Sequence, residues 1–370
     1  MPESPDAHYL PPPGAPVARK AVVPGRPPAV PFRRAPDSAR RPRWVWPRRI
    51  VRVACWSYLV LAISLWLLLR LEGDRWWVAT LVLFGPRWVW AMPLLLLAPA
   101  VLLLRRRSLW VLAAGAGVIV WPVMGLCLPS HHLMSGYNAA APLRVLTCNT
   151  HWHTVRIPDM QKLIADARPD IVALQECSVE TAQAIFSAGD WCVRMDGELC
   201  LASRYPLKKV FDIGRADWPD LYGIAVQYQV QTPTGNIPFI NLHLESPHVP
   251  IRAAVSGAPD REKQVQDNSR HRLRQVISVA QRARDLGPDV LLAGDFNTTC
   301  DSFIFRQNLS GFSDAFSDAG FGFGWTYRVR GTDARIDHIL AGTHWRCRRC
   351  WVGPDVGSPH VPVIADFRVR

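Results

Sequence analysis

Residues 131–370 lack the excess of basic side chains that nucleic-acid-binding domains usually carry. They contain 26 Lys and Arg against 25 Asp and Glu, whereas residues 1–52 contain 11 basic and 3 acidic side chains. The net charge of +13 therefore resides mainly in the first third of the 370-residue chain. Because binding to nucleic acid depends on neutralising phosphates with Lys and Arg, this near-neutrality counts against a bulk nucleic-acid binder.

Three other signals are missing. Cys347 and Cys350 have a spacing that occurs in zinc sites, but neither a second such pair nor a His pair accompanies them, so we expect no zinc centre. Residues 1–42 lack a periodic apolar pattern and are rich in Pro, Arg and Ala. We therefore expect a disordered, cytoplasmic tail over residues 1–50. An apolar stretch with a small-residue cleavage site does not follow closely, which counts against a secretory signal.

Long uncharged stretches are present between residues 51 and 128. Three of them are each about as long as a bilayer-spanning helix: Val53–Leu69, Trp88–Leu104 and Leu109–Leu128. Tryptophans cluster near their ends, as they do at membrane–water interfaces. We therefore expect a three-span transmembrane region over residues 51–128, with the lipid bilayer as its partner. A buried helical hairpin of a soluble protein is the alternative.

Basic residues predict the orientation of this region. The tail and the link Arg105-Arg106-Arg107 should face the cytoplasm, because Lys and Arg are enriched in cytoplasmic flanks of spans. The link from Arg70 to Arg87 mixes basic residues with Glu72 and Asp74, which fits the outside. Three spans would then place residues 131–370 outside the cytoplasm, after a linker over residues 129–141.

Residues 142–370 alternate short apolar runs with amphipathic stretches, which favours a mixed α/β fold. The apolar runs predict strands at Leu143–Cys148, Ile171–Leu174, Leu199–Ala202, Ile237–Leu244, Val290–Ala293, Ile336–Leu340 and Val361–Phe367. Helical spacing predicts helices at Ile157–Ala167 and Ser269–Leu286. We expect a two-sheet α/β sandwich with helices outside. Cys192 and Cys200 flank the turn signal Asp196-Gly197 and are a plausible disulfide pair.

The most informative motif is the end of the strand at Val290–Ala293. Gly294 and then Asp295-Phe296-Asn297 follow this apolar run. Two polar residues spaced two apart at a strand end aim their side chains the same way. An acid beside an amide there can bind a metal or position a water, although an Asp that only forms a turn is the alternative.

Six further patterns follow strands in a fixed order. They are Asn149; Gln175-Glu176; Ser203-Arg204-Tyr205-Pro206; Asn241-Leu242-His243; Arg335-Ile336-Asp337-His338; and Ser358-Pro359-His360. Together with the motif at Asp295, this series resembles the endonuclease/exonuclease/phosphatase superfamily over about residues 142–370. With the preceding spans, the chain resembles a bacterial membrane-bound branch of that family. The resemblance implies the two-sheet sandwich and metal-assisted hydrolysis of a phosphate ester.

The expected metal is magnesium, with manganese as the alternative ion. Magnesium prefers oxygen ligands and usually takes only one or two carboxylates from a protein, and Glu176 at a strand end can supply one. The resemblance places Asn149 beside it, in contact with metal or phosphate. A solvated Glu and a turn-capping Asn are the structural alternatives.

The resemblance also implies a catalytic set: Asp295, Asn297, His243, Asp337 and His360. Asp295 would orient or deprotonate the attacking water, and Asn297 would hold water or phosphate. His243 would contact phosphate or donate a proton. Asp337 would support that histidine or bind metal, unless it is simply an ion-pair partner of Arg335.

One position departs from the family pattern, because Pro359 stands where an Asp usually precedes the last His. Either fewer protein groups hold the metal, or Asp355 substitutes for the Asp, or activity is reduced. We expect an active enzyme, because the other motif residues are present. By resemblance, Arg272 and Trp325 are expected as substrate-binding residues, in a supporting place and in the cleft wall.

The leading hypothesis is a membrane-anchored, magnesium-dependent phosphohydrolase or phosphodiesterase that acts outside the cytoplasm. Its phosphate-ester substrate could be a lipid-linked phosphate or pyrophosphate, because tethering holds the cleft near headgroups. One alternative is a nuclease for exterior DNA or RNA, which a local basic patch keeps open: Arg270, Arg272, Arg274, Arg282 and Arg284. Another is a non-catalytic membrane receptor, motivated by Pro359. A protein partner is not evident from the sequence.

Overall fold

A computed structural model describes residues 45–129, 143–213, 224–329 and 331–370. Residues 1–44 of the expected tail and residues 130–141 of the expected linker lie outside these ranges. Helix α1 begins at Val45, so the last residues of the segment assigned to the tail are helical instead.

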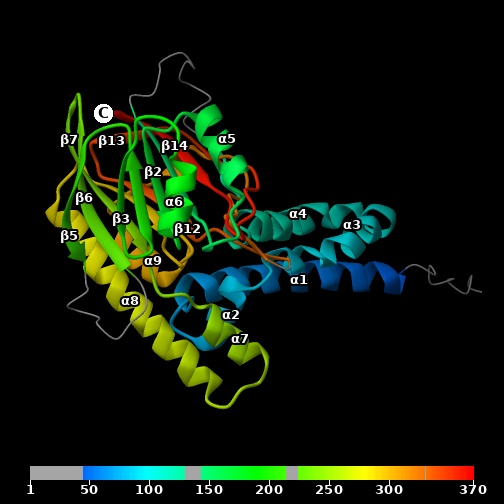
Figure 1. Ribbon diagram of the computed structural model, residues 1–370. Helices are drawn as coiled ribbons and strands as arrows, with labels where there is room; N and C mark the ends of the chain where they lie inside the picture. The colour runs from blue at the N-terminus through cyan, green and yellow to red at the C-terminus, as the bar shows by residue number, and fades with distance from the viewer. Residues whose placement is uncertain (1–44, 130–142, 214–223, 330) are drawn as a thin grey trace, which may run out of the picture. The chain divides into compact units, whose positions relative to one another are not determined.

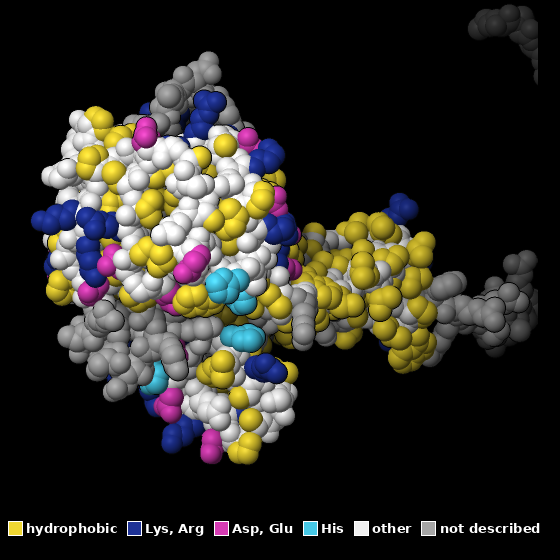
Figure 2. Space-filling view, in the orientation of Figure 1, with side chains coloured by type: hydrophobic (Ala, Val, Ile, Leu, Met, Phe, Trp, Pro, Cys, Tyr) yellow, Lys and Arg dark blue, Asp and Glu magenta, His cyan; other side chains and the backbone are white. Residues whose placement is uncertain are grey.

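The N-terminal part of the described chain is helical. Its elements are α1 (Val45–Leu71), α2 (Trp77–Phe84), η1 (Arg87–Ala91), α3 (Pro93–Leu104), η2 (Arg106–Ser108), α4 (Leu109–Val118) and η3 (Ile119–Val123). Two helical stretches are long and apolar enough to cross a membrane, judged by length and composition: Val45–Leu71 with 27 residues and Arg87–Leu104 with 18. Apolar side chains such as Trp46, Leu96 and Leu103 are exposed on these helices, and Figure 2 shows hydrophobic side chains gathered there.

The third expected span, Leu109–Leu128, is not confirmed. Helix α4 is only 10 residues long. It continues as the π-helical turn η3, which contains Pro122 and ends at Val123. Proline removes a backbone donor and crowds the preceding turn, so a regular α-helix does not extend through this position. The described chain therefore contains two helices of spanning length rather than three.

Residues 143–370 form two six-stranded sheets (Figure 1). The first has the order β13-β14-β1-β2-β4-β3, from β1 (Leu143–Asn149), β2 (Ile171–Gln175), β3 (Cys192–Asp196), β4 (Leu199–Ser203), β13 (Trp345–Val352) and β14 (Val363–Val369). The second has the order β5-β6-β7-β8-β12-β9, from β5 (Leu207–Ile213), β6 (Ile224–Thr232), β7 (Gly235–His243), β8 (Leu291–Asp295), β9 (Ser313–Asp314) and β12 (Asp337–Ala341). A separate hairpin pairs β10 (Tyr327–Val329) with β11 (Thr332–Ala334).

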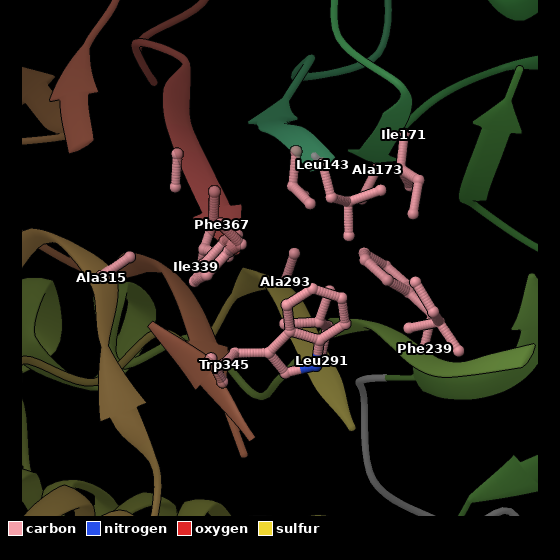
Figure 3. Close-up of a cluster of buried hydrophobic side chains, with 14 of the residues drawn as sticks. Leu143, Ile171, Ala173, Phe239, Leu291, Ala293, Ala315, Ile339, Trp345 and Phe367 are labelled. Carbon is pink, nitrogen blue, oxygen red and sulfur yellow. The ribbon is translucent and has the colours of Figure 1, made fainter. Parts of the chain in front are cut away.

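The main core lies between the two sheets. Leu143 and Ile171 of the first sheet and Phe239 and Leu291 of the second belong to one buried cluster, and their side chains meet in Figure 3. A second cluster packs α5 (Ile157–Ala167) and α6 (Val179–Ile185) on the outer face of the first sheet. A third packs α8 (Arg261–Asp285) and α9 (Phe303–Leu309) on the second. The remaining helices are α7 (His248–Val255) and α10 (Ala315–Ala319). This arrangement confirms the predicted two-sheet sandwich with helices outside.

The expected bridge between Cys192 and Cys200 is absent. The β3–β4 hairpin forms around Asp196-Gly197 as the turn signal predicted, but its register sets Cys192 opposite Ser203 and Cys200 opposite Met195. Both cysteines are free, one exposed and one buried. The turn was therefore recognised correctly, whereas the pairing inferred from it was wrong.

Candidate active site

Three of the predicted catalytic residues lie side by side at the ends of three adjacent interior strands of the second sheet. Strand β8 runs parallel to β7, with His243 opposite Asp295, and antiparallel to β12, with Asp337 opposite Asp295. Backbone pairing therefore sets the three side chains in one row across neighbouring strands. In the first sheet, the parallel pair β1–β2 likewise brings Asn149 level with Gln175, directly before Glu176.

Gly294 permits the close approach of β7 and β8 next to Asp295. Its φ is +147°, and a Cβ at this position would lie 1.9 Å from the carbonyl oxygen of Leu242. A side chain cannot occupy that space without displacing backbone, so only glycine fits. The glycine of the motif thus brings the carboxylate of Asp295 into line with His243.

Asn149 joins the two sheets at the site. Its Nδ2 donates to Glu176 Oε1 at 3.0 Å and to Asp295 Oδ2 at 3.1 Å. Its Oδ1 accepts from the backbone N–H of His151 at 2.9 Å. Asn149 is fully buried, and Asp295 is 1% exposed. The Asn149 amide therefore holds the carboxylate of Glu176, from the first sheet, beside the carboxylate of Asp295, from the second. These are the predicted metal ligand and the predicted water-orienting group.

His243 lies between carboxylates at the more open side of the site. Its Nδ1 is 2.6 Å from Glu198 Oε1, and its Nε2 is 3.6 Å from Glu176 Oε1 and 3.8 Å from Asp295 Oδ2. Burial disfavours the imidazolium, but the hydrogen bond with Glu198 and the charges of Asp295 and Glu176 raise the pKa of His243 to about 9. His243 is therefore a cation at neutral pH, and it faces the site through Nε2.

A second histidine–carboxylate pair lies deeper. His360 Nδ1 is 2.9 Å from Asp337 Oδ2, and His360 Nε2 is 3.8 Å from Asp295 Oδ2. Asp337 is positioned by Thr326, whose hydroxyl accepts its backbone N–H at 3.1 Å. Tyr327 covers the His360 ring edge-on, with centroids 4.9 Å apart. Although burial opposes the charge, Asp337 and Asp295 raise the pKa of His360 to about 8.

Asp295 and Asn297 form the centre of the site. Asp295 Oδ1 accepts the backbone N–H of Asn297 at 2.8 Å, and Asn297 Nδ2 donates to the carbonyl of Leu244 at 2.8 Å. Asn297 has a φ of +47°, which turns the chain sharply after β8. Burial, reinforced by the charge of Asp337, raises the pKa of Asp295 to about 6, against the opposing effect of the two histidines.

The donor set fits a divalent cation. Ligand atoms of Asp295, Asp337 and His360 lie within 4.8 Å of one another, and all three residues are buried. Glu176 offers a carboxylate oxygen on the other side of Asp295, where we predicted the metal ligands, whereas Asn149 directs its Nδ2 at both carboxylates and its Oδ1 at the backbone N–H of His151. Two neighbouring buried carboxylates that repel each other are the arrangement that a cation neutralises, and oxygen-rich sites suit magnesium or manganese. The residues present therefore match a divalent-metal site.

Arg272 is fully buried and bonds to Asn268, to the carbonyl of Asn297 and to Asp74, so its substrate-binding role stays a prediction. Two other expectations are corrected. Asp355 is exposed and lies beside Arg156, so it does not replace the family Asp missing at Pro359. Arg335 pairs with Asp314 at 3.1 Å, so the ion pair suggested for Asp337 does not form.

Trp325 and Glu198 show what the sequence could and could not reveal. Trp325 is half-buried and stacks on Phe323, with ring centroids 4.7 Å apart, so its substrate role stays a prediction.

Glu198, the partner of His243, was missed. It lies in the β3–β4 turn, whose Asp196-Gly197 signal was visible. Only the pairing of β4 with β2 carries that turn to the site.

Comparison with known proteins gives a family match. Residues 146–360 match the model of the Endonuclease/Exonuclease/phosphatase family. Similar solved structures include an endonuclease/exonuclease/phosphatase from Beutenbergia cavernae, with 17% identity and a TM-score of 0.46, covering 61% of this chain and 71% of that one. A mannosyl-6-phosphatase from Bacteroides thetaiotaomicron has 16% identity and a TM-score of 0.45, covering 61% and 99%. D. rerio TDP2 with a single-stranded DNA product has 16% identity and a TM-score of 0.44, covering 61% and 99%. The comparison with curated proteins gives no match.

Proposed function

The chain belongs to the endonuclease/exonuclease/phosphatase family, and on that premise we propose that it is a membrane-anchored, divalent-metal-dependent hydrolase of phosphoric esters. The observation that carries the proposal is the Asn149 amide, which holds Glu176 and Asp295 together across the two sheets. Two histidines with raised pKa values flank this pair. Hydrolysis of a phosphate ester needs such a concentration of oriented charge, because its barrier is mainly electrostatic.

The side chains divide the work by position. The carboxylate of Asp295 orients an attacking water and accepts its proton, since a group with a pKa of about 6 is mostly ionised at neutral pH. The imidazolium of His243 neutralises a phosphate oxygen at the open side of the site, and Glu198 keeps it protonated. His360, held by Asp337, supplies a second positive charge beside Asp295.

A divalent cation completes this set. Glu176 would hold it, with Asn149 if the amide turned its Oδ1 toward the ion, or Asp295 and Asp337 would hold it with His360 in its neutral form. When bound, it supplies positive charge to the phosphate oxygens of the substrate. We propose magnesium, with manganese as the alternative ion, because carboxylate oxygens dominate the donor set.

Contacts at the ends of the helices support the membrane topology. Asp74, just after α1, pairs with Arg272 of the family domain at 3.0 Å. Arg87, at the start of η1, reaches Asp301 at 2.6 Å and the carbonyl of Val123, at the end of η3, at 3.0 Å. An α1 that crosses the bilayer has Arg48, Arg49 and Arg52 near one end and the family domain at the other, and the Arg87–Val123 contact returns the chain to the domain's end. Because basic flanks stay in the cytoplasm, we propose that the domain lies outside, as in a membrane-bound branch of the family.

The proposed substrate is a phosphate ester or pyrophosphate carried by a lipid. The same contacts tie the end of α1 to the strand-end loop after Asp295, so a bilayer crossed by α1 would bring its headgroups near the catalytic groups. The rate of hydrolysis close to the headgroups benefits from the high local concentration of a membrane-bound substrate.

The two alternatives are less well supported. A nuclease would use the basic residues of α8, but Arg272 is buried, Arg270 pairs with Asp267 at 2.7 Å and Arg282 bonds to Gln227 at 2.8 Å. Arg272 and Arg270 are thus paired with carboxylates, which leaves fewer unpaired arginines on α8 for a phosphate backbone than the sequence suggests, while Arg282 keeps its charge beside the neutral Gln227. A non-catalytic receptor would not need the histidine–carboxylate pairs, whose geometry matches acid–base chemistry.

A substrate panel tests the proposal. Detergent-purified full-length protein is assayed on polyprenyl pyrophosphate, phospholipid, DNA and a generic phosphodiester, each with magnesium and with chelator, beside Glu176→Ala. We expect magnesium-dependent release of phosphate from the lipid-linked ester, lost in the variant. Cleavage of DNA with a steep salt dependence would favour the nuclease instead. Protease resistance of a C-terminal tag on intact cells would contradict the exterior location.

A further inference from the structure

Arg272 is a fully buried arginine at the junction between the helices and the active site. Arginine is rarely buried unless its charge is paired and its donors are bonded. Its Nη2 donates to Asp74 Oδ1 at 3.0 Å, and its Nε donates to Asn268 Oδ1 at 3.1 Å. Its Nη1 donates to the backbone carbonyl of Asn297 at 3.3 Å and lies 3.4 Å from the hydroxyl of Thr298. One guanidinium thus connects a carboxylate after α1 to the backbone of a catalytic residue.

Asp74 comes from outside the residues that match the family. It follows α1 in the sequence, it is 4% exposed, and its other oxygen accepts the backbone N–H of Ile304 at 3.3 Å, at the start of α9. The carboxylate therefore contacts α8 through Arg272 and the first turn of α9 through Ile304. Because Arg272 also bonds the carbonyl of Asn297, Asp74 is connected to both ends of the segment that runs from Asn297 to α9.

The conformation of Asn297 makes this connection matter. A φ of +47° is a conformation that asparagine tolerates but does not prefer, so neighbouring contacts must hold it. Arg272 holds its carbonyl, while its N–H donates to Asp295 Oδ1 and its amide donates to Leu244. A shift of the carbonyl would rotate the same backbone segment whose N–H orients the Asp295 carboxylate.

We propose that Asp74 is a positioning residue of the active site, which acts through Arg272 to fix the backbone of Asn297 and hence the carboxylate of Asp295. The inference rests on the proposed hydrolase function and adds to it that the helical region completes the catalytic site. A second contact also joins the helices to the surroundings of the site. Trp88 Nε1 donates at 2.8 Å to the carbonyl of Gly331, in the β10–β11 hairpin that carries Tyr327. Activity of the family domain therefore depends on its docking to the helices through Asp74.

The test compares two matched variants of the full-length protein in detergent. Asp74→Asn removes the charge that holds Arg272, whereas Asp301→Asn removes the partner of Arg87 in a second ion pair between the helices and the domain. Kinetic constants on a generic phosphodiester with magnesium are measured well below the melting temperature. Hydrogen exchange by mass spectrometry follows the segment 295–298 in the absence of substrate.

For Asp74→Asn we expect kcat to fall on the order of 100-fold with little change in KM, because small misplacements of catalytic groups have such effects. Exchange in segment 295–298 should accelerate. Asp74→Glu keeps the charge and should recover much of kcat, which also covers the case that Asp74→Asn fails to fold. Asp301→Asn should lower the melting temperature but leave kcat within about threefold of wild type, since its pair does not reach Asn297.

Three outcomes would overturn the positioning role: wild-type kcat and exchange in Asp74→Asn, equal losses of kcat in Asp74→Asn and Asp301→Asn, or no recovery in a folded Asp74→Glu. Absence of turnover in the wild type on every phosphate ester would instead contradict the proposed function. The exchange measurement would then decide by itself whether Asp74 fixes the loop.

Discussion

Replacing Asp295 with asparagine should stabilise the metal-free protein while it abolishes hydrolysis. The carboxylate is 1% exposed and neighbours the carboxylate of Asp337, and both effects raise its pKa to about 6. A carboxyl group with a raised pKa binds its proton more tightly in the folded state. Its ionised form therefore destabilises the fold above that pKa, and the cost decreases as the pH falls from about 6 toward the ordinary value of 3.8.

The magnitude follows from the two pKa values. The difference between the ordinary 3.8 and about 6 corresponds to a cost of about 3 kcal/mol at neutral pH. An asparagine oxygen can still accept the N–H of Asn297, but the bond from Asn149 Nδ2 to Oδ2 is lost, at about 1 kcal/mol. The net gain for Asp295→Asn without metal is about 2 kcal/mol, which raises the melting temperature by a few degrees.

The assay is thermal unfolding of the detergent-purified protein in chelator at two pH values. At pH 7.5 Asp295→Asn should melt above wild type, whereas at pH 5 the wild-type carboxyl is largely protonated and the difference should shrink. Asp314→Asn is the matched control. Burial opposes the ionised form of Asp314, but Arg335 and His338 hold its pKa below the ordinary range. Removing that charge should destabilise the protein by about 3–5 kcal/mol at pH 7.5.

The reasoning would be refuted if Asp295→Asn melted below wild type in chelator at pH 7.5. Asp295 would then be a structural hydrogen-bonding group, and its burial would not reflect a site kept for function. Retention of hydrolytic activity in the same variant would contradict the catalytic role separately. The two measurements thus test the stability argument and the chemical argument independently.

Three further predictions follow from single contacts. Glu198→Gln should lower the pKa of His243 from about 9, because the substitution removes the negative charge that favours the imidazolium. The alkaline limb of the pH profile of kcat/KM should then move to lower pH by about one unit, and an unchanged limb would show that Glu198 does not set this pKa. Gly294→Ala should lower the free energy of unfolding by more than about 3 kcal/mol in chemical denaturation, because the added Cβ would lie 1.9 Å from the carbonyl oxygen of Leu242. An unchanged free energy of unfolding would mean that β7 and β8 lie farther apart. Pro359→Asp should tighten magnesium binding on the order of tenfold in calorimetry, because another carboxylate joins the site, and equal affinity would mean that the family Asp is dispensable here.

The parts of the fold that were predictable are those with a local signal. The helix at Ile157–Ala167 was predicted with the bounds it has in the structure, because its apolar face repeats at helical spacing. The buried strands β1, β2, β8 and β12 were placed to within one or two residues from short apolar runs. Strands β5 and β13, by contrast, were not predicted: their residues alternate in burial at the sheet edges, and several of them are charged.

The candidate site shows the same division. The resemblance of the ordered motifs to a known family predicted Asn149, His243, Asp337 and His360, whereas Glu176 and Asp295 were also indicated by their positions at strand ends. Glu198 lies in a turn, so only the tertiary fold connects it to His243. Asp74 and Arg272 are 198 positions apart, and a sequence cannot show that a buried arginine meets a carboxylate from the helical region. The third span was predicted from the length of an uncharged stretch and from tryptophans near its ends, and neither signal registers the change of helix type around Pro122.

Anomalous diffraction from crystals grown with manganese tests the central claim most directly, because it locates a divalent cation without reference to turnover. The claim predicts one or more peaks within coordination distance of the carboxylates of Glu176, Asp295 or Asp337, and weaker occupancy in crystals of Glu176→Ala. Crystals saturated with manganese that show no peak among these side chains would contradict it.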